Sequence, residues 1–469
     1  MDNPLSKLLN FYKSRNFVQA EKEYLNIAKK VKPNHELLNL YGVILFELKK
    51  YDQAVTQLKK SIEINPDYYQ GYNSLGNIFF KKNDLNAALE AYQKAIDLKF
   101  DYYETYHNRG NVYLKLRQID KALENYNLST KFNSRYLPAI KSKIDIHYSF
   151  KNHKLALEEI QNYLSIEPSN ASMYHQRGDI FAEIKSYDLA LQSYEKAHIL
   201  NPEKSFLLGG IQLTKSRMCI WSDFFEMKKL IQDKIIKQEK VSSPYTVTTL
   251  YDSPKIQFEC AKVWQNEYKL KYKKNFSFKK KVSKKIKLGF FSADFRTHAM
   301  GHLMVGMLEL HNRSQFELYG FYIGPKIKSS DTLHNRIFKC FDKFMDISLM
   351  SDLEALNLCR ELEIDIAIDF MCHTGDYNRF NLFLERLAPI QINFLGYPGT
   401  SGSNNLDYIV ADKILIKPDE QKFYSEKIIY LPDTYQPNEN YKKISSTVVK
   451  KEAFGLPEDK FIFCCFNSH

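Results

Sequence analysis

A 34-residue period governs the first 204 residues of the chain. Periods of this length indicate stacked supersecondary units, because one such unit cannot bury its apolar face alone. The period divides the segment without gaps into 1–34, 35–68, 69–102, 103–136, 137–170 and 171–204. Alanine holds the twentieth place of every unit, as Ala20, Ala54, Ala88, Ala122, Ala156 and Ala190.

Three further places of the period have physical roles. A small residue at places eight and twenty lets two helices approach, an aromatic residue at place twenty-four fills the gap between helix pairs, and a proline at place thirty-two ends the second helix. This spacing resembles the tetratricopeptide repeat, so we predict an α-solenoid over 1–204. Leu8 and Ile144 depart at the glycine place, which suggests a capping first unit and a looser fifth. The residues that follow the rule are Gly42, Gly76, Gly110, Gly178, Tyr24, Tyr92, Tyr126, Tyr194, Pro66, Pro168 and Pro202.

Such a solenoid curls into a superhelix whose concave face binds extended peptides. We therefore expect protein or peptide acceptors in the repeat groove. The alternative interpretation is that polar residues on these helices are only a solvated face. The candidate groove residues near the first helices of the units are Asn39, Asn73, Asn77, His107, Asn108 and Asn111.

Charge and cysteine content exclude some functions. The net charge is +12, and the segment from Lys269 to Lys287 holds ten lysines and no acid, so the basic character is local and a nucleic-acid partner is unlikely. The seven cysteines are scattered without a CxxC pair, which is typical of a reducing compartment. No apolar run reaches about 18 residues. We expect a cytoplasmic protein without a membrane partner.

The sequence pattern changes after residue 204. Residues 205–285 read as a helical connector with a lysine-rich linker, entered through an amphipathic helix near Trp221. From 286 to 450 short β-rich runs such as IKLGFF and DIAIDF alternate with helical stretches such as DLEALNLCREL. This alternation predicts βαβ units and a parallel sheet, in which ligands gather at the carboxyl ends of the strands.

Three clusters of candidate site residues follow predicted strands. Asp294, His298 and His302 come first, and a carboxylate four residues before an imidazole can orient it for proton transfer. The second cluster has no spacing typical of a metal site. The third is a glycine-rich run that lets backbone N–H groups approach a phosphate or sugar, although many such runs are turns. The second and third clusters comprise Asp369, His373 and Arg379, then Gly396, Tyr397, Gly399, Thr400, Ser401 and Gly402.

Five motifs in order resemble the protein O-GlcNAc transferase family, which joins tetratricopeptide repeats to a two-domain GT-B glycosyltransferase. They are SADFRTHAMGHLM, APIQINFLGYPGTSG, DYIVAD, YSEKIIYLPDTYQPN and FGLPEDKFIFCCFN. The resemblance implies a Rossmann-like α/β lobe and inverting transfer of a sugar from a nucleotide sugar to Ser or Thr of a protein. UDP-GlcNAc is the expected donor, and glucose or fucose donors remain open. No metal or other cofactor is implied.

The resemblance also implies roles for single residues. His298 and Asp294 match positions considered catalytic or donor-binding in the family. We predict donor or acceptor contacts from the other polar residues of the clusters and from the glycine-rich loop. These are His302, His373, Arg379, Leu395, Gly396, Tyr397, Pro398, Gly399 and Thr400.

The sequence departs from the family at several points. Ala299 and Met300 stand where the family has Pro-Thr, and Tyr245 and Thr246 stand where animal members carry connector histidines. Residues 451–469 resemble the start of the second, nucleotide-binding lobe, so we expect the 469-residue chain by itself to be nearly inactive. The alternative function is a repeat scaffold or adaptor with a degenerate transferase lobe.

Overall fold

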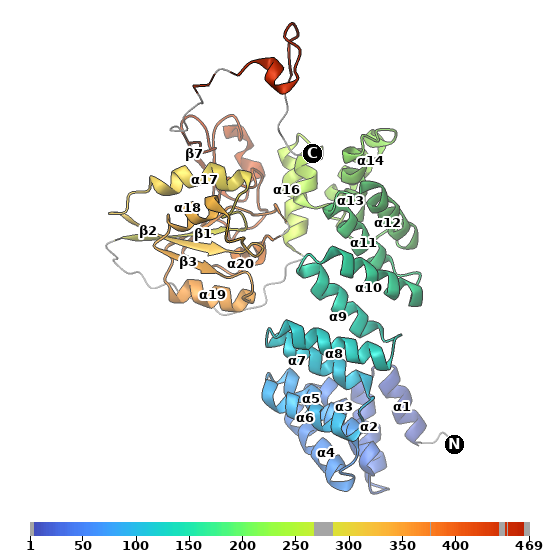
Figure 1. Cartoon of the computed structure of the whole chain (residues 1–469). Coiled ribbons are helices and arrows are strands. Elements are labelled where there is room, and N and C mark those ends of the chain that lie inside the picture. The colour runs from blue at the N-terminus through green and yellow to red at the C-terminus, as the bar shows by residue number, and fades with distance from the viewer. Residues whose placement is uncertain (1–3, 267–284, 376, 440–445, 448, 464–469) are drawn as a thin grey trace. The chain divides into compact units, whose positions relative to one another are not determined.

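A computed structural model describes residues 4–266, 285–375, 377–439, 446–447 and 449–463. The chain forms two compact units, Met1–Trp221 and Ser222–His469 (Figure 1). Most of the predicted lysine-rich linker, residues 267–284, lies outside the described residues.

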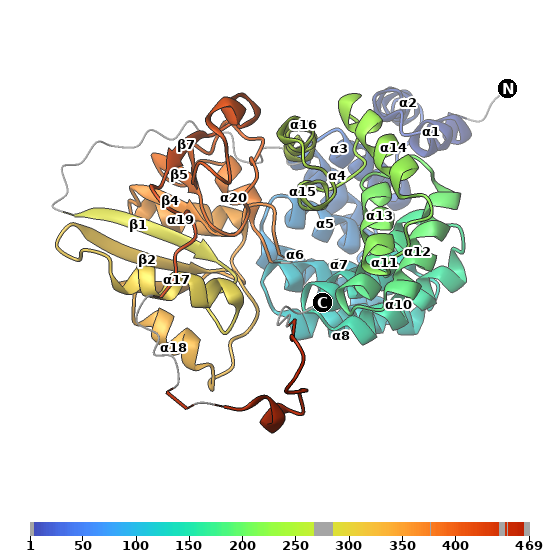
Figure 2. The same ribbon diagram turned by 90° about the horizontal axis from the view of Figure 1, so that it is seen from above.

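The first unit is a helical solenoid, as the period predicts. Each 34-residue unit forms two antiparallel helices, and one further helix, α13, packs beside α11 and α12 (Figure 2). The helices are α1 Pro4–Lys13, α2 Phe17–Ala28, α3 His35–Glu47, α4 Tyr51–Ile64, α5 Tyr69–Lys81, α6 Leu85–Leu98, α7 Tyr103–Lys115, α8 Ile119–Phe132, α9 Leu137–Ser149, α10 His153–Ile166, α11 Ala171–Glu183, α12 Tyr187–Leu200 and α13 Leu207–Arg217.

In three units the glycine at place eight packs against the tyrosine ring at place twenty-four, and in the second unit Gly42 packs against Leu58. A Cβ on Gly110 would lie 2.6 Å from Tyr126, and one on Gly178 would lie 2.4 Å from Tyr194. In the fifth unit both places change together, since Ile144 and Ile160 are buried in one cluster. The loss of glycine there is accompanied by the loss of the large ring, so the helix pair still closes.

The turn inside each helix pair has the same backbone conformation. Its fifteenth residue always lies in the left-handed region, with φ between 56° and 66°, although no unit has glycine there. The residues are Arg15, Lys49, Asn83, Arg117, Lys151 and Lys185. Cys219 repeats this conformation one period later, with φ 57°. The repeat geometry therefore extends through α13, beyond the point where the sequence period is lost.

The second unit begins with three helices of the connector. They are α14 Phe224–Ile236, α15 Pro244–Leu250 and α16 Pro254–Gln265. The Cys260 thiol of α16 donates to Ser242 O at 3.2 Å, and a Cβ on Gly402 would meet the Ala261 backbone at 2.5 Å. The connector therefore packs onto the loop that carries the predicted glycine-rich run.

A seven-stranded sheet forms the centre of the second unit, and every strand pair is parallel. Its order is β3-β2-β1-β4-β5-β6-β7, so the winding direction reverses between β1 and β4. The parallel sheet confirms the prediction from the alternating pattern, and its strand order is that of a doubly wound sheet. The strands are β1 Ile286–Ser292, β2 Phe316–Tyr322, β3 Lys343–Asp346, β4 Ile366–Asp369, β5 Ile390–Asn393, β6 Tyr408–Ala411 and β7 Lys427–Tyr430.

Helices cover both faces of this sheet (Figure 1). Phe290 faces the cluster that α17 and α18 form, whereas Phe291 faces the cluster of α19 and α20. Successive side chains of β1 point to opposite faces of the sheet, so they belong to two separate hydrophobic cores. The remaining elements are α17 Ala299–Glu309, α18 Thr332–Phe338, α19 Asp352–Glu361, α20 Phe380–Leu384 and the 3-10 turns η1 Pro418–Phe423 and η2 Lys451–Phe454.

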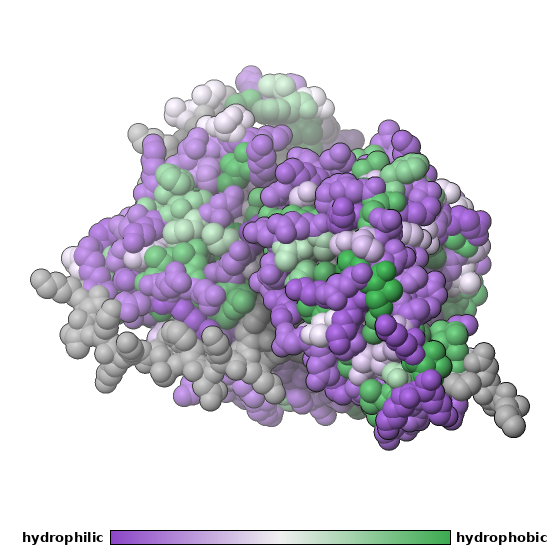
Figure 3. Space-filling model, turned by 90° about the horizontal axis from the view of Figure 1, so that it is seen from below, coloured by the Kyte–Doolittle hydropathy of each residue, from purple (hydrophilic) through white to green (hydrophobic). Residues whose placement is uncertain are grey.

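The predicted first strand of a further lobe falls near the end of the described chain. Residues 461–463 carry no regular secondary structure, and residues 464–469 lie outside the described residues. Among the described helices, none has the length and apolarity that a membrane crossing requires. Hydrophilic side chains cover most of the face drawn in Figure 3, with small apolar patches between them.

Candidate functional site

The three predicted clusters lie on adjacent strands. Asp294 follows β1, His373 follows β4 and Leu395 follows β5, and these strands are neighbours in the sheet. Parallel strands end at one edge, so the sheet brings these loops together at the β1/β4 point where its winding reverses. Open α/β sheets bind their ligands at such a point.

The loop after β1 holds a carboxylate and an imidazole together. Asp294 is 7% exposed, and its backbone N–H donates to Ser292 Oγ at 2.9 Å. Its Oδ2 lies 3.4 Å from His298 Nδ1, and its Oδ1 accepts from Arg296 at 3.3 Å. Burial raises the pKa of Asp294, although His298 and Arg296 oppose the shift. The buried carboxyl therefore faces an exposed imidazole.

His298 is the N-cap residue of α17, and its side chain is 41% exposed. Its Nδ1 lies 3.3 Å from the Met300 amide, so the unprotonated nitrogen can accept from that N–H. When protonated, the same nitrogen can donate to Asp294. Either way Nε2 has no partner among the described residues. His302 is exposed one helical turn further along α17.

The β5 loop packs tightly on the end of β4. A Cβ at Gly396 would lie 1.8 Å from Phe370 O, so no other residue fits this position without moving the backbone. The preceding Leu395 has φ 73°, a strained conformation for a branched side chain. Asn393 holds the loop, because its Nδ2 donates to Tyr397 O and Gly399 O at 3.1 Å each.

Several residues that the sequence analysis assigned to donor or acceptor contacts form a buried anchor below the loop. His373 Nε2 donates to Ser401 O at 2.9 Å, and burial lowers the pKa of His373 to about 4. Thr400 Oγ1 donates to the buried Glu426 at 2.8 Å, and Tyr397 OH accepts from Thr248 Oγ1 at 3.3 Å. These side chains hold the loop, whereas Gly396 and Pro398 remain partly exposed.

Arg379 lies in a half-buried ion pair with Asp352. Its Nε lies 3.1 Å from Asp352 Oδ1, and its terminal nitrogen donates to Ile347 O at 2.8 Å. The guanidinium therefore joins the β4 loop to the start of α19. The structure places it with these elements and not beside Asp294.

Two buried oxygens at the strand ends have no partner among the described residues. They are Asp369 Oδ2 and Asn393 Oδ1, on residues that pair in register across β4 and β5. Burial raises the pKa of Asp369 to about 6, so this carboxyl keeps its proton to a higher pH than a carboxyl exposed to water does. Sequence reasoning placed Asp369 in a cluster but missed Asn393, since an asparagine at a strand end carries no distinctive signal.

Four of the candidate groove asparagines make hydrogen bonds within the solenoid. Asn77 and Asn111 accept from Tyr92 and Tyr126 at 2.7 and 2.8 Å. Asn73 is buried and accepts from Thr105 and Asn108 at 3.1 and 3.0 Å. Their carbonyl oxygens are thus occupied inside and between helix pairs.

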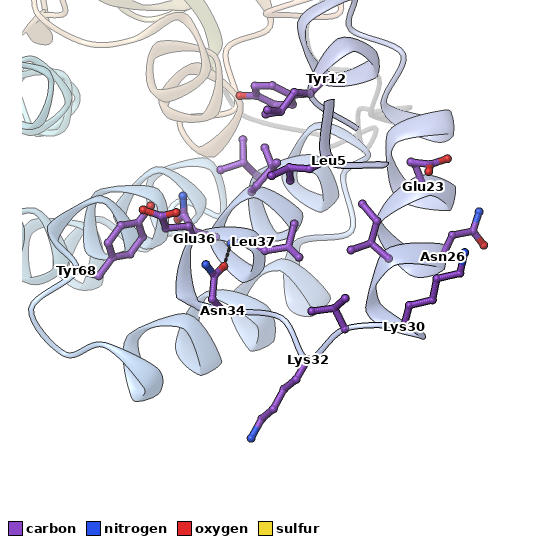
Figure 4. Close-up of a pocket in the computed structure, with 16 residues that line it drawn as sticks. Leu5, Tyr12, Glu23, Asn26, Lys30, Lys32, Asn34, Glu36, Leu37 and Tyr68 are labelled. Atoms are coloured by element: carbon purple, nitrogen blue, oxygen red, sulfur yellow. Dashed lines mark hydrogen bonds between the residues drawn. The ribbon is translucent and has the colours of Figure 1, made fainter. Parts of the chain in front are cut away.

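A separate apolar groove of about 760 Å³ lies in the first two units (Figure 4). Leu5 and Tyr12 of α1 and Leu37 of α3 contribute to its walls, while Glu23 of α2 and Lys30, which follows α2, stand at its rim. Leu5 and Leu9 are 44% and 36% exposed there.

No group of three or more His, Cys, Asp or Glu side chains in the described residues could hold a metal ion. The candidate site offers a carboxyl-backed imidazole beside a close-packed glycine loop. Such a pair can accept a proton from a hydroxyl and hold the resulting positive charge.

Known families match both units of the chain. Residues 218–442 match glycosyl transferase family 41. Residues 42–83 and 76–116 match the TPR repeat, and residues 103–136 and 171–203 match the tetratricopeptide repeat. Fold and site thus define a tetratricopeptide-repeat protein with a glycosyltransferase region. In its repeats and its glycosyltransferase region the chain is similar to the protein O-GlcNAc transferases.

Individual proteins that are similar to this chain are named as N-acetylglucosaminyltransferases or O-GlcNAc transferases. A probable UDP-N-acetylglucosamine–peptide N-acetylglucosaminyltransferase SEC of Arabidopsis thaliana is 33% identical over 39% of this chain and 19% of its own length. The corresponding transferase of Caenorhabditis elegans is 28% identical over 32% of this chain and 13% of its length. A solved Thermobaculum terrenum O-GlcNAc transferase mutant is 20% identical with TM-score 0.45, covering 79% of this chain and 58% of that one. The chain therefore spans only a small part of the curated relatives' length.

Proposed function

We propose that this chain provides the acceptor-selecting repeats and the sugar-facing lobe of a protein O-linked N-acetylglucosaminyltransferase. The observation that carries the proposal is the Asp294–His298 pair, which lies beside the Gly396 loop where the sheet reverses its winding. The donor would be UDP-GlcNAc, and the acceptor a Ser or Thr hydroxyl of a protein. No metal takes part in the proposed step.

In the proposed reaction His298 is the general base. Nδ1–H donates to Asp294, which leaves Nε2 to accept the hydroxyl proton of the acceptor. The hydroxyl oxygen bonds to the anomeric carbon as the bond from that carbon to the diphosphate oxygen breaks, and UDP leaves with the electron pair. Asp294 then stabilises the imidazolium, because its carboxylate lies 3.4 Å from Nδ1. We assign sugar contact to the backbone of the Gly396 loop, where a Cβ at Gly396 would lie 3.6 Å from Met300 Cε of α17.

A donor screen tests the proposed reaction. The protein is expressed from its complete natural reading frame and incubated with a Ser/Thr peptide library and UDP-GlcNAc, UDP-glucose or GDP-fucose, and peptide masses are read by mass spectrometry. We expect transfer of N-acetylglucosamine. Transfer of a different sugar would correct the donor, and no transfer from any donor would favour the adaptor function.

The apolar groove of the first two units is the proposed docking surface for acceptor proteins. Its exposed leucines give it an apolar floor, and Lys30 and Glu23 give it a mixed-charge rim. We expect Leu9→Glu to weaken capture of peptides that the wild-type protein modifies. Leu155→Glu is the matched control, since Leu155 is 45% exposed on α10 and lies outside the groove. Equal capture by the two variants would remove the groove from the proposal.

We also place the protein in the cytoplasm. Five described cysteines, at 219, 260, 340, 359 and 372, are free thiols, which agrees with a reducing compartment. Cell fractionation with an antibody against the chain tests this location, and recovery in a secretory fraction would contradict it.

A further inference from the structure

The loop that carries Asp294 and His298 is tied to a helix from another part of the lobe. Asp331, the N-cap of α18, accepts from the Thr297 amide with Oδ2 at 2.8 Å and from Thr297 Oγ1 with Oδ1 at 2.8 Å. The same Oδ1 caps α18 by accepting from the His334 amide at 2.8 Å. One carboxylate therefore joins the start of α18 to the residue next to His298.

A second side chain of α18 holds the same loop from its other side. His334 Nδ1 donates to Phe295 O at 2.7 Å. Phe295 is itself fully buried, against Phe341, Phe344 and Phe370. Residues on both sides of Arg296 are thus fixed, and the short segment between Asp294 and His298 has little freedom to move.

We propose that Asp331 and His334 are positioning residues that hold His298 against Asp294. The inference rests on the proposed function, since it names residues that act through the proposed base. Neither residue touches the imidazole, so their effect passes through the Thr297 and Phe295 backbone. Misplacing a reacting group by about 1 Å costs about 100-fold in rate, so contacts that fix this loop affect the rate of the reaction.

The contacts distinguish the tie from the helix cap. Asp331→Ala removes both. Thr297→Val removes the hydroxyl contact and leaves the cap on α18 unchanged. In Asp331→Asn the side chain has only one oxygen. If that oxygen takes the place of Oδ1, it keeps the helix cap and the bond from Thr297 Oγ1; if it takes the place of Oδ2, it keeps only the bond from the Thr297 amide.

Asp342→Ala is the matched control. Asp342 is also a partly exposed carboxylate that holds backbone in this lobe, because its Oδ2 accepts from the Leu318 amide at 2.7 Å. Leu318 lies in the first half of β2, whereas Asp294 follows the end of β1. The control therefore removes a comparable contact toward the opposite end of the strands.

The first readout is the ¹⁵N spectrum of the His298 ring, which reports its tautomer and is assigned with His298→Gln. We expect Asp331→Ala to shift and broaden these signals, Thr297→Val to do so less, and Asp342→Ala to leave them as in the wild type. If Asp331→Ala leaves the ring signals unchanged, or if Asp342→Ala changes them equally, the proposal is overturned. This readout needs no transferase activity.

The second readout is turnover with the donor that the screen identifies. We expect Asp331→Ala to lower kcat about 10- to 100-fold, with KM for the donor little changed, because an oriented base acts in the transition state. Asp331→Asn should recover part of this loss. Equal kcat losses in Asp331→Ala and Asp342→Ala would refute the positioning role. Absence of transfer in the wild type would instead count against the proposed function alone.

Discussion

Single side chains decide how closely the helices of each pair approach. A Cβ added to Gly110 would lie 2.6 Å from the Tyr126 ring. Asn108 joins two units through its hydrogen bond to Asn73. We expect Gly110→Val to lower the free energy of unfolding by about 1–3 kcal/mol through overpacking. Asn108→Ala should cost about 1 kcal/mol, the usual value of one hydrogen bond. Thermal melts of the repeat unit compare them, and an equal or larger shift for Asn108→Ala would count against this packing.

The Gly396 position leaves no room for a side chain. We expect Gly396→Ala to move the loop off β4, since its Cβ would lie 1.8 Å from Phe370 O. A strain of this kind typically costs more than about 1 kcal/mol. A fall in Tm together with faster amide exchange at Leu395 and Tyr397 is the expected result. A variant with wild-type Tm and exchange would show that the loop is not close-packed.

The buried His373 makes stability depend on pH. Its pKa is lowered by burial to about 4, while an unfolded histidine titrates near 6.5. Between these values the unfolded chain binds a proton that the folded chain does not, so the contribution of His373 to stability is lost as pH falls from about 6.5 to 4. Asp369, with its pKa raised to about 6, acts in the opposite direction, because its contribution is lost as pH rises from about 4 to 6.

Comparing the free energy of unfolding of two variants separates the effect of His373 from that of Asp369. Urea denaturation of wild type and His373→Gln is compared between pH 7.5 and 4.5. Glutamine can still donate to Ser401 O but does not titrate, so the advantage of the wild type should shrink as pH falls. A difference that stays constant over this range would show that His373 is not buried in its neutral form.

At the scale of elements, the sequence predicts long periodic segments well and short ones poorly. The repeats place every helix pair, and apolar runs such as IKLGFF place β1, because burial on both faces demands continuous apolar residues. The strand Lys343–Asp346 was missed, since it is short and has a charged residue at each end. The 3-10 turn Pro418–Phe423 and helix α20 were also missed, because both are short.

Helix α13 is an element that the period does not predict. It buries Leu207 and Ile211 against Tyr194, the aromatic residue of the last repeat. A fragment 1–221 should therefore be more stable than 1–204, because the shorter one exposes this apolar face. Circular dichroism melts of both fragments test this, and both should be helical. Equal Tm values would show that α13 adds nothing, and a disordered spectrum of 1–221 would contradict independent folding of the repeats.

At the scale of the whole molecule, the sequence predicted which loops form the candidate site but not how their side chains are held. Motif order and strand pattern were enough to bring Asp294, His298 and Gly396 to one edge of the sheet. The roles of His373 and Thr400 could not be read from sequence, because a buried anchor and a ligand contact use the same polar residues. Only the packing of Ser401 and Glu426 shows that they face inward.

The most direct test of the account is the rate of sugar transfer in a single turnover, measured at saturating donor for the protein from its complete reading frame. His298→Ala is compared with His311→Gln. His311 follows the C-terminal end of α17, and its Nδ1 donates to Met307 O at 2.8 Å. The account predicts that His298→Ala slows transfer about 100-fold or more, the usual contribution of a general base, while His311→Gln stays near the wild-type rate. A wild-type rate in His298→Ala would contradict it.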